Sequence, residues 1–116
     1  MLNRLNRPVY YSKRIQPGEE NYQEGIETFA APVKRLLHFR SISGEAVLLT
    51  GGELSEQRLV SRISSFSKDK YFENDRLYIG IDIPPEFDPV DPKANYRVVS
   101  VSTNPNITEI VFEKMV

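Results

Sequence analysis

Hydrophobic and polar residues alternate along several short segments of the chain, and a period of two predicts β-strands buried on one face. In the run 58–66, Leu59 and Ile63 fall on one face with small serines, while Arg58 and Arg62 fall on the other. Prolines, glycines and asparagines separate such runs and predict turns. The segments predicted to be strands are 9–15, 26–37, 58–66, 75–79, 96–102 and 107–115.

These strands predict the fold class. No segment shows the sustained 3.6-residue period of a long amphipathic helix, although the stretch 41–56 is compatible with one helical turn as well as with a long loop. About six short strands joined by turns predict an all-β fold, a small closed or partly open β-barrel with long loops, because closure hides the strand edges. The predicted core residues recur at the strand period: Leu59, Ile63, Leu77, Val99, Val101, Ile110 and Phe112.

Two connections are too long to serve only as turns in so small a barrel. The connection 41–56 has an apolar centre, Val47, Leu48 and Leu49. We expect a neighbouring subunit or partner ring to cover these three residues. The alternative, that they fold back onto their own barrel, stays open because a short apolar run cannot be placed by its pattern alone.

The second long connection, 80–94, is rich in proline and acidic residues, which predicts a stiff acidic loop without regular pairing. Glu86 and Asp88 are its central carboxylates, and they are candidates for contact with a basic neighbour. Arg4 and Arg7 in a basic N-terminal arm, residues 1–8, are the corresponding candidates on the other side of such a contact.

Composition narrows the function classes. The chain has 116 residues, 40% hydrophobic and 27% charged, which is typical of one globular domain over 1–116. A net charge of -1 argues against a dedicated nucleic-acid binder. The absence of cysteine excludes disulfides, thiolate metal sites and cysteine nucleophiles. No secretory signal and no apolar run long enough to cross a bilayer is present, so we expect synthesis in a cytoplasm and no membrane association.

The search for catalytic chemistry favours a protein that is not an enzyme. His38 is the only histidine and has no cysteine to join it in a metal site, so we assign it no catalytic or metal-binding role. Prolines break the carboxylate spacing of 82–91, which therefore lacks the pattern of a calcium loop. No phosphate-binding loop or serine triad is recognisable. We expect no cofactor and no bound metal.

Five motifs carry a family resemblance through their order along the chain. All five come after a short basic N-terminus, a strand and a loop. In chain order the motifs are Gly44–Glu45, Arg58–Ile63 (RLVSRI), Asp75–Ile79 (DRLYI), Tyr96–Val101 (YRVVSV) and Glu109–Glu113 (EIVFE). In this order they resemble the head-tail joining proteins of tailed bacteriophages, the head-tail adaptor or head-closure family. The resemblance covers about Leu5 to Met115. The chain departs from the family in its longer, proline-rich 80–94 segment and in Asn95, where a Gly-Lys turn is common.

The resemblance implies a structural subunit of the virion. Copies of the chain would form an oligomeric ring in the phage neck that joins the portal to the tail and continues the DNA channel. Its implied partners are other copies of itself, a portal or adaptor protein, a tail terminator or tail tube protein, and genomic DNA that passes without sequence-specific binding. Two alternatives stay open: a tail-terminator or other tail-completion ring protein, and a small barrel that binds single-stranded nucleic acid.

Overall fold

Seven β-strands form one antiparallel sheet in the computed structural model, which describes residues 7–41 and 58–115. None of the described residues is helical. The sheet order is β2-β1-β5-β6-β7-β4-β3. The strands are β1 (Arg7–Ser12), β2 (Val33–Leu37), β3 (Arg40–Ser41), β4 (Arg58–Ser64), β5 (Arg76–Tyr78), β6 (Tyr96–Thr103) and β7 (Ile107–Lys114).

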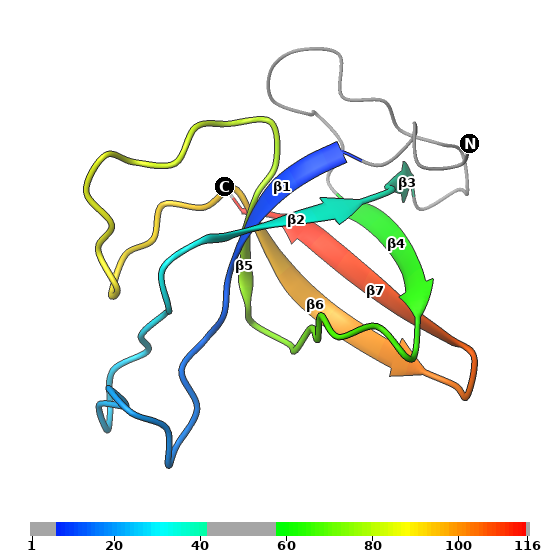
Figure 1. The fold of residues 1–116 in the computed structure, drawn as a ribbon. Helices are drawn as coiled ribbons and strands as arrows, with labels where there is room; N and C mark the ends of the chain where they lie inside the picture. Colours follow the sequence, from blue (N-terminus) through cyan, green and yellow to red (C-terminus); the bar gives the residue numbers. More distant parts are fainter. Residues whose placement is uncertain (1–6, 42–57, 116) are drawn as a thin grey trace.

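The segment from β2 to β3 curls the sheet into a barrel. β2 and β3 lie at the two edges of the sheet, yet only His38 and Phe39 separate them along the chain. One end of this segment therefore pairs with β1 and the other with β4, and it crosses the gap between the two edges (Figure 1). The prediction of an all-β, partly open β-barrel is confirmed. If β2 and β3 are counted as one bent strand, the number of strands also matches.

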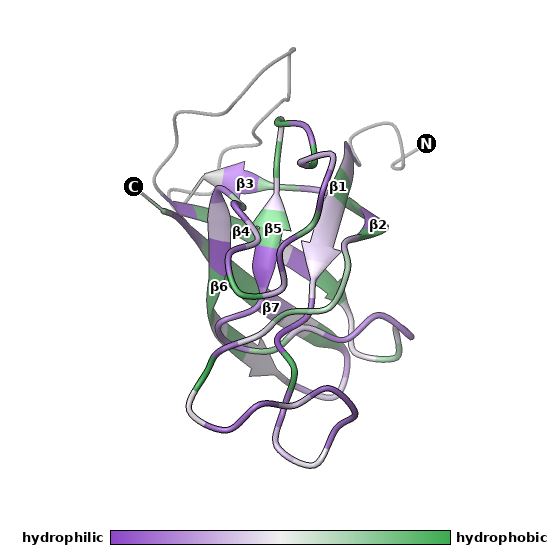
Figure 2. Cartoon of the chain, turned by 90° about the vertical axis from the view of Figure 1, so that its left-hand side faces the viewer, coloured by the Kyte–Doolittle hydropathy of each residue, from purple (hydrophilic) through white to green (hydrophobic). Residues whose placement is uncertain are grey.

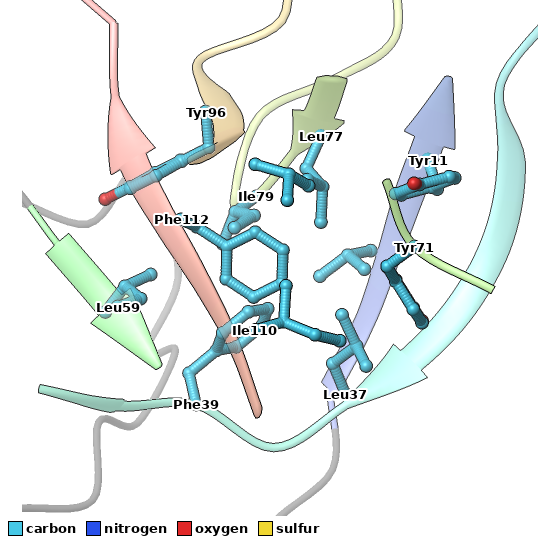
Figure 3. Close-up of a cluster of buried hydrophobic side chains, with 12 residues drawn as sticks. Tyr11, Leu37, Phe39, Leu59, Tyr71, Leu77, Ile79, Tyr96, Ile110 and Phe112 are labelled. Atoms are coloured by element: carbon cyan, nitrogen blue, oxygen red, sulfur yellow. The ribbon is translucent and has the colours of Figure 1, made fainter. Parts of the chain in front are cut away.

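The core lies inside this curled sheet. Side chains from the strands and from the β2–β3 segment converge there, with Phe112 in the middle of the cluster (Figure 3). The Phe112 ring meets the ring of Phe39 edge to face, with 5.6 Å between their centroids. The predicted core residues Leu59, Leu77, Ile110 and Phe112 are all fully buried, and Ile63 and Val101 are partly buried and pack against them.

The prediction for Val99 is wrong, and a β-bulge is the reason. Val98 lies opposite Phe112, but Ser100 rather than Val99 lies opposite Val111, so the register shifts at Val99. Val98 takes the buried position, and because of the extra residue in the bulge the next side chain that points inward is that of Val101. A strict period of two across β6 therefore places Val99 on the wrong face.

The first strands begin and end differently from the prediction. β1 begins at Arg7, so Arg7 and Pro8, expected in the N-terminal arm, belong to the sheet, where they pair with β2. Proline is tolerated at this place because it lies at the start of the strand. β1 ends at Ser12, and in the second predicted strand only Val33–Leu37 forms a strand, after Pro32.

A hairpin joins the last two strands, β6 and β7. The side-chain oxygen of Asn104 accepts hydrogen bonds from the backbone N–H groups of Asn106 (2.9 Å) and Ile107 (2.8 Å), which closes the turn. The segment 80–94 contains no strand, as its prolines predict. It extends from the barrel on the same side as the 13–32 connection, whereas β4 and β7 lie on the other side (Figure 1).

Candidate interaction surface

The outer face of β4, β7 and β6 carries valines surrounded by charged side chains. Alternation along β4 buries Leu59 and turns Arg58, Val60 and Arg62 outward. The antiparallel register then sets Val60 opposite Val111, beside the bulged Val99. We call this surface the valine–arginine face; its members are Val60, Val99 and Val111 at the centre and Arg58, Arg62, Arg97, Glu109 and Glu113 around them.

Ion pairs cross the strands on this face. Glu113 accepts hydrogen bonds from Arg58 Nη2 at 3.1 Å and from Arg97 Nη2 at 3.0 Å, and Arg62 Nε lies 2.9 Å from Glu109 Oε2. The hydrogen bonds from Arg58 and Arg97 lower the pKa of Glu113. Exposed pairs of this kind contribute little to folding free energy. The face therefore carries three arginines and two glutamates around three partly buried valines.

The acidic loop, residues 80–94, has the largest net charge of the connections among the described residues. It holds four carboxylates and one lysine. Glu86 and Asp88 are exposed, and Asp88 Oδ1 accepts a hydrogen bond from the Val90 N–H at 3.0 Å. Val90, between Asp88 and Asp91 in the sequence, is 56% exposed. The loop thus presents an apolar side chain among carboxylates.

Buried polar contacts fix the acidic loop to the barrel. The Tyr78 hydroxyl donates a hydrogen bond to the Pro92 carbonyl, and burial raises the pKa of Tyr78. The Asn95 side chain accepts from the Ile79 N–H at 2.9 Å and donates to the Ile79 carbonyl at 2.8 Å. The loop base is therefore anchored in the manner of an additional strand pair.

A buried carboxylate holds the other side of the barrel together. Asp75 is fully buried and accepts hydrogen bonds from the Arg14 N–H at 2.8 Å and the Phe72 N–H at 3.1 Å. Burial raises the pKa of Asp75 to about 6, against the lowering effect of these two donors. Asp75 joins segments that lie far apart in the sequence, and this role is structural.

A hollow lies beside the 69–73 segment. It has a volume of about 470 Å³ and lies between the end of β4, the 69–73 segment and β6. Ile63, Val101 and Tyr71 contribute to its lining, which explains why Ile63 and Val101 are only partly buried. Arg35 covers the neighbouring end of the core, with its guanidinium 4.0 Å from the centroid of Tyr11 and 4.7 Å from that of Tyr71.

His38 lies in the crossing between β2 and β3 and is partly buried. Burial, with smaller effects of Arg40 and Arg7, lowers its pKa. Over residues 7–41 and 58–115, no group of three or more histidine and carboxylate side chains is arranged to hold a metal ion. In the same ranges no helix is long and apolar enough to cross a bilayer.

The residues predicted from sequence to form interfaces fall in three places. Arg7 lies in β1 opposite Leu37. Glu86 and Asp88 lie together in the acidic loop. Arg4, Val47, Leu48 and Leu49 lie outside the described residues.

Sequence reasoning missed the valine–arginine face as a candidate surface. The alternating pattern put Arg58 and Arg62 on the outer side of one strand, and a similar alternation puts Glu109 and Glu113 on one side of another. Their cross-strand pairing identifies the surface, and only the register provides it.

The chain was compared with protein-family models, with curated proteins and with solved structures, and none of them matches. The family resemblance therefore depends on the motifs themselves and on the elements that they form.

Proposed function

We propose that the chain is a structural subunit of a ring in the neck of a tailed bacteriophage, where it joins the portal or head to the tail and continues the DNA channel. One observation carries the proposal: four of the motifs that resemble the head-tail joining family occupy neighbouring positions in one all-β barrel. Arg58–Ile63 lies in β4, the 75–79 motif includes β5, Tyr96–Val101 lies in β6 and Glu109–Glu113 lies in β7.

The architecture suits a subunit that works through its contacts. A curled sheet with a fully buried aromatic and aliphatic core provides a stiff body. Loops held on a rigid scaffold are the usual carriers of binding residues. In this chain the acidic loop is anchored by Tyr78 and Asn95, and it still exposes Val90. In the proposed assembly, other copies of the chain, the portal or adaptor, and the tail terminator or tail tube supply the neighbours.

Self-association is the first test. The purified chain, examined by sedimentation velocity and negative-stain microscopy over a concentration series, is expected to form closed rings. A chain that stays monomeric at its highest soluble concentration, and also binds single-stranded oligonucleotides with a steep salt dependence, would instead support the nucleic-acid-binding alternative.

The joining role has its own test. The Leu48→Asp, Leu49→Asp double variant is expected to keep the circular dichroism of the parent chain but to fail to join phage heads to tails in a complementation assay. Undiminished infectivity with this folded variant contradicts the assignment of 47–49 to an interface. An unfolded variant instead supports packing of these residues onto their own barrel.

A further inference from the structure

We infer that the acidic loop of one copy docks on the valine–arginine face of the next copy, so that these two surfaces form the repeating contact of the assembly. This inference rests on the proposed function, because it names the contact through which the proposed ring forms. The two surfaces match in charge, in polarity pattern and in their placement on the barrel.

Charge complementarity is the first argument. The acidic loop carries four carboxylates and a single basic residue, Lys93. Lys93 Nζ lies 3.6 Å from Asp91 Oδ2. On the face, three arginines stand against two glutamates, and Glu113 is shared by Arg58 and Arg97. Opposite potentials on two surfaces favour their encounter and fix their register.

The arginines keep donors for a second carboxylate. Arg62 uses its Nε in the ion pair with Glu109, and its side chain is 61% exposed. Arg58 uses Nε and Nη2 toward Glu113 and is 53% exposed. A guanidinium has five N–H donors, so each of these side chains can bind an incoming carboxylate without leaving its present partner.

The polarity pattern of the two surfaces also corresponds. Val90 stands among carboxylates in the loop, and the Val60–Val111 pair stands among arginines and glutamates on the face. An apolar centre with a charged rim is the usual arrangement of a protein interface. Prolines stiffen the loop, so docking costs it less conformational entropy than it costs an unrestrained segment.

The placement on the barrel permits a head-to-tail contact between copies. The acidic loop leaves the barrel on one side, and β4 and β7 lie on the other (Figure 1). In the view turned by 90°, β4 and β6 form one side of the barrel, and β1 and β2 form the opposite side (Figure 2). Two different surfaces on different sides of one subunit produce a heterologous contact, which closes into a ring when the rotation allows.

Two charge-reversed variants test the contact. The loop variant carries Asp82→Lys and Glu86→Lys, and the face variant carries Arg58→Glu and Arg62→Glu. Each variant alone then sets like charges against like at every contact, and we expect self-association at least about tenfold weaker than in the parent chain. Mixing the two variants sets opposite charges together at every contact, and the mixture is expected to associate again.

Controls separate this contact from folding and from general charge effects. The circular dichroism of each variant reports folding, and Arg58→Gln with Arg62→Gln provides a milder face variant if the reversal unfolds the chain. A matched control carries Lys34→Glu and Glu20→Lys, two exposed residues outside both surfaces, and is expected to associate as the parent does. Association of the parent is expected to weaken from roughly 0.1 M to roughly 1 M salt.

The outcomes distinguish this inference from the proposed function. Restored association in the mixture, with each variant weak alone, supports the loop–face contact. If the parent forms rings and both variants form them equally well, or if the weakened variants fail to associate when mixed, the inference is wrong while the ring assignment stands. A parent that remains monomeric contradicts both.

Discussion

Asp75 makes the free energy of unfolding depend on pH in a direction unusual for a carboxylate. Its side chain is fully buried, and its pKa is raised from 3.8 to about 6. Between these two pH values the folded protein holds a proton that the unfolded chain has released. The protein is therefore most stable below about pH 4 with respect to this group and loses stability as the pH rises to about 6. The difference between the two pKa values corresponds to about 3 kcal/mol.

The Asp75→Asn variant isolates this effect, because asparagine has nearly the same shape and does not titrate. Its amide oxygen keeps one of the hydrogen bonds that Asp75 accepts from Arg14 and Phe72. We expect urea unfolding followed by circular dichroism to show that the parent loses stability relative to the variant, by up to about 3 kcal/mol, as the pH rises from below 4 to above 6. Subtracting the two curves removes the contributions of the other titrating groups.

The sign of the pH-dependent difference in stability between the parent and Asp75→Asn shows whether burial or hydrogen bonding dominates the pKa of Asp75. A parent that gains stability relative to Asp75→Asn over the same range would mean that the two backbone donors outweigh burial. Two parallel curves would mean that the pKa of Asp75 is the same in the folded and unfolded states. Either result refutes the reasoning.

Three other predictions concern the core, the loop anchor and His38. Phe112→Ala is expected to cost about 3–5 kcal/mol of unfolding free energy, whereas Phe66→Ala, at a side chain that is 83% exposed, is expected to change it by less than about 0.5 kcal/mol in denaturant titrations. Asn95→Ala leaves the N–H and the carbonyl of Ile79 without their side-chain partner and is expected to lower the free energy of unfolding by about 2–4 kcal/mol. Amide hydrogen exchange in the acidic loop is expected to be faster in this variant, and exchange equal to that of the parent contradicts the role of Asn95 as an anchor. Because the pKa of His38 is lowered, the parent is expected to lose stability as the pH falls below its ordinary value of 6.5, and His38→Ala is expected to lack this loss. His38→Ala is also expected to assemble normally, and loss of a bound metal or of a measured turnover in this variant contradicts our assignment of no catalytic or metal-binding role.

The strands were predictable where alternation continued without interruption. In β4 and β7 a strict period of two placed Leu59, Ile110 and Phe112 inside, as the structure has them. The same period of two gave the wrong face for Val99, because the bulge adds one residue to β6 and nothing in the valine-rich sequence of this strand marks the position of the bulge. A bulge is defined by the partner strand, which a single segment does not contain.

Several buried aromatic residues were not predictable for a related reason. β1 reads Val9-Tyr10-Tyr11, apolar on both faces, so its pattern does not decide which tyrosine is inside. Tyr11 proves to be buried, covered by Arg35 from β2. Tyr78 faces away from Leu77 along β5 and is still buried, because the acidic loop returns over it. These burials depend on segments that are distant in sequence.

The candidate surfaces were partly readable from the sequence. Proline density and carboxylates identified the acidic loop, and Glu86 and Asp88 are indeed exposed there. The valine–arginine face required the register of three strands, because Arg58 and Arg97 become neighbours only through Glu113 between them. Charged side chains on different strands form a common surface only when strand pairing brings them together, and the sequence of a single strand does not show this pairing.

The anchors of the acidic loop connect the fold to its proposed interactions. A loop that is ordered only on docking loses conformational entropy at every contact, and this cost is subtracted from the affinity. Here Asn95 and Tyr78 have already fixed the base of the loop within the folded subunit, and their hydrogen bonds are buried. The entropy of ordering the loop base is therefore lost on folding and not on association. Weak surface charges can then suffice for a contact that repeats around an assembly, because each copy brings its loop in the same geometry.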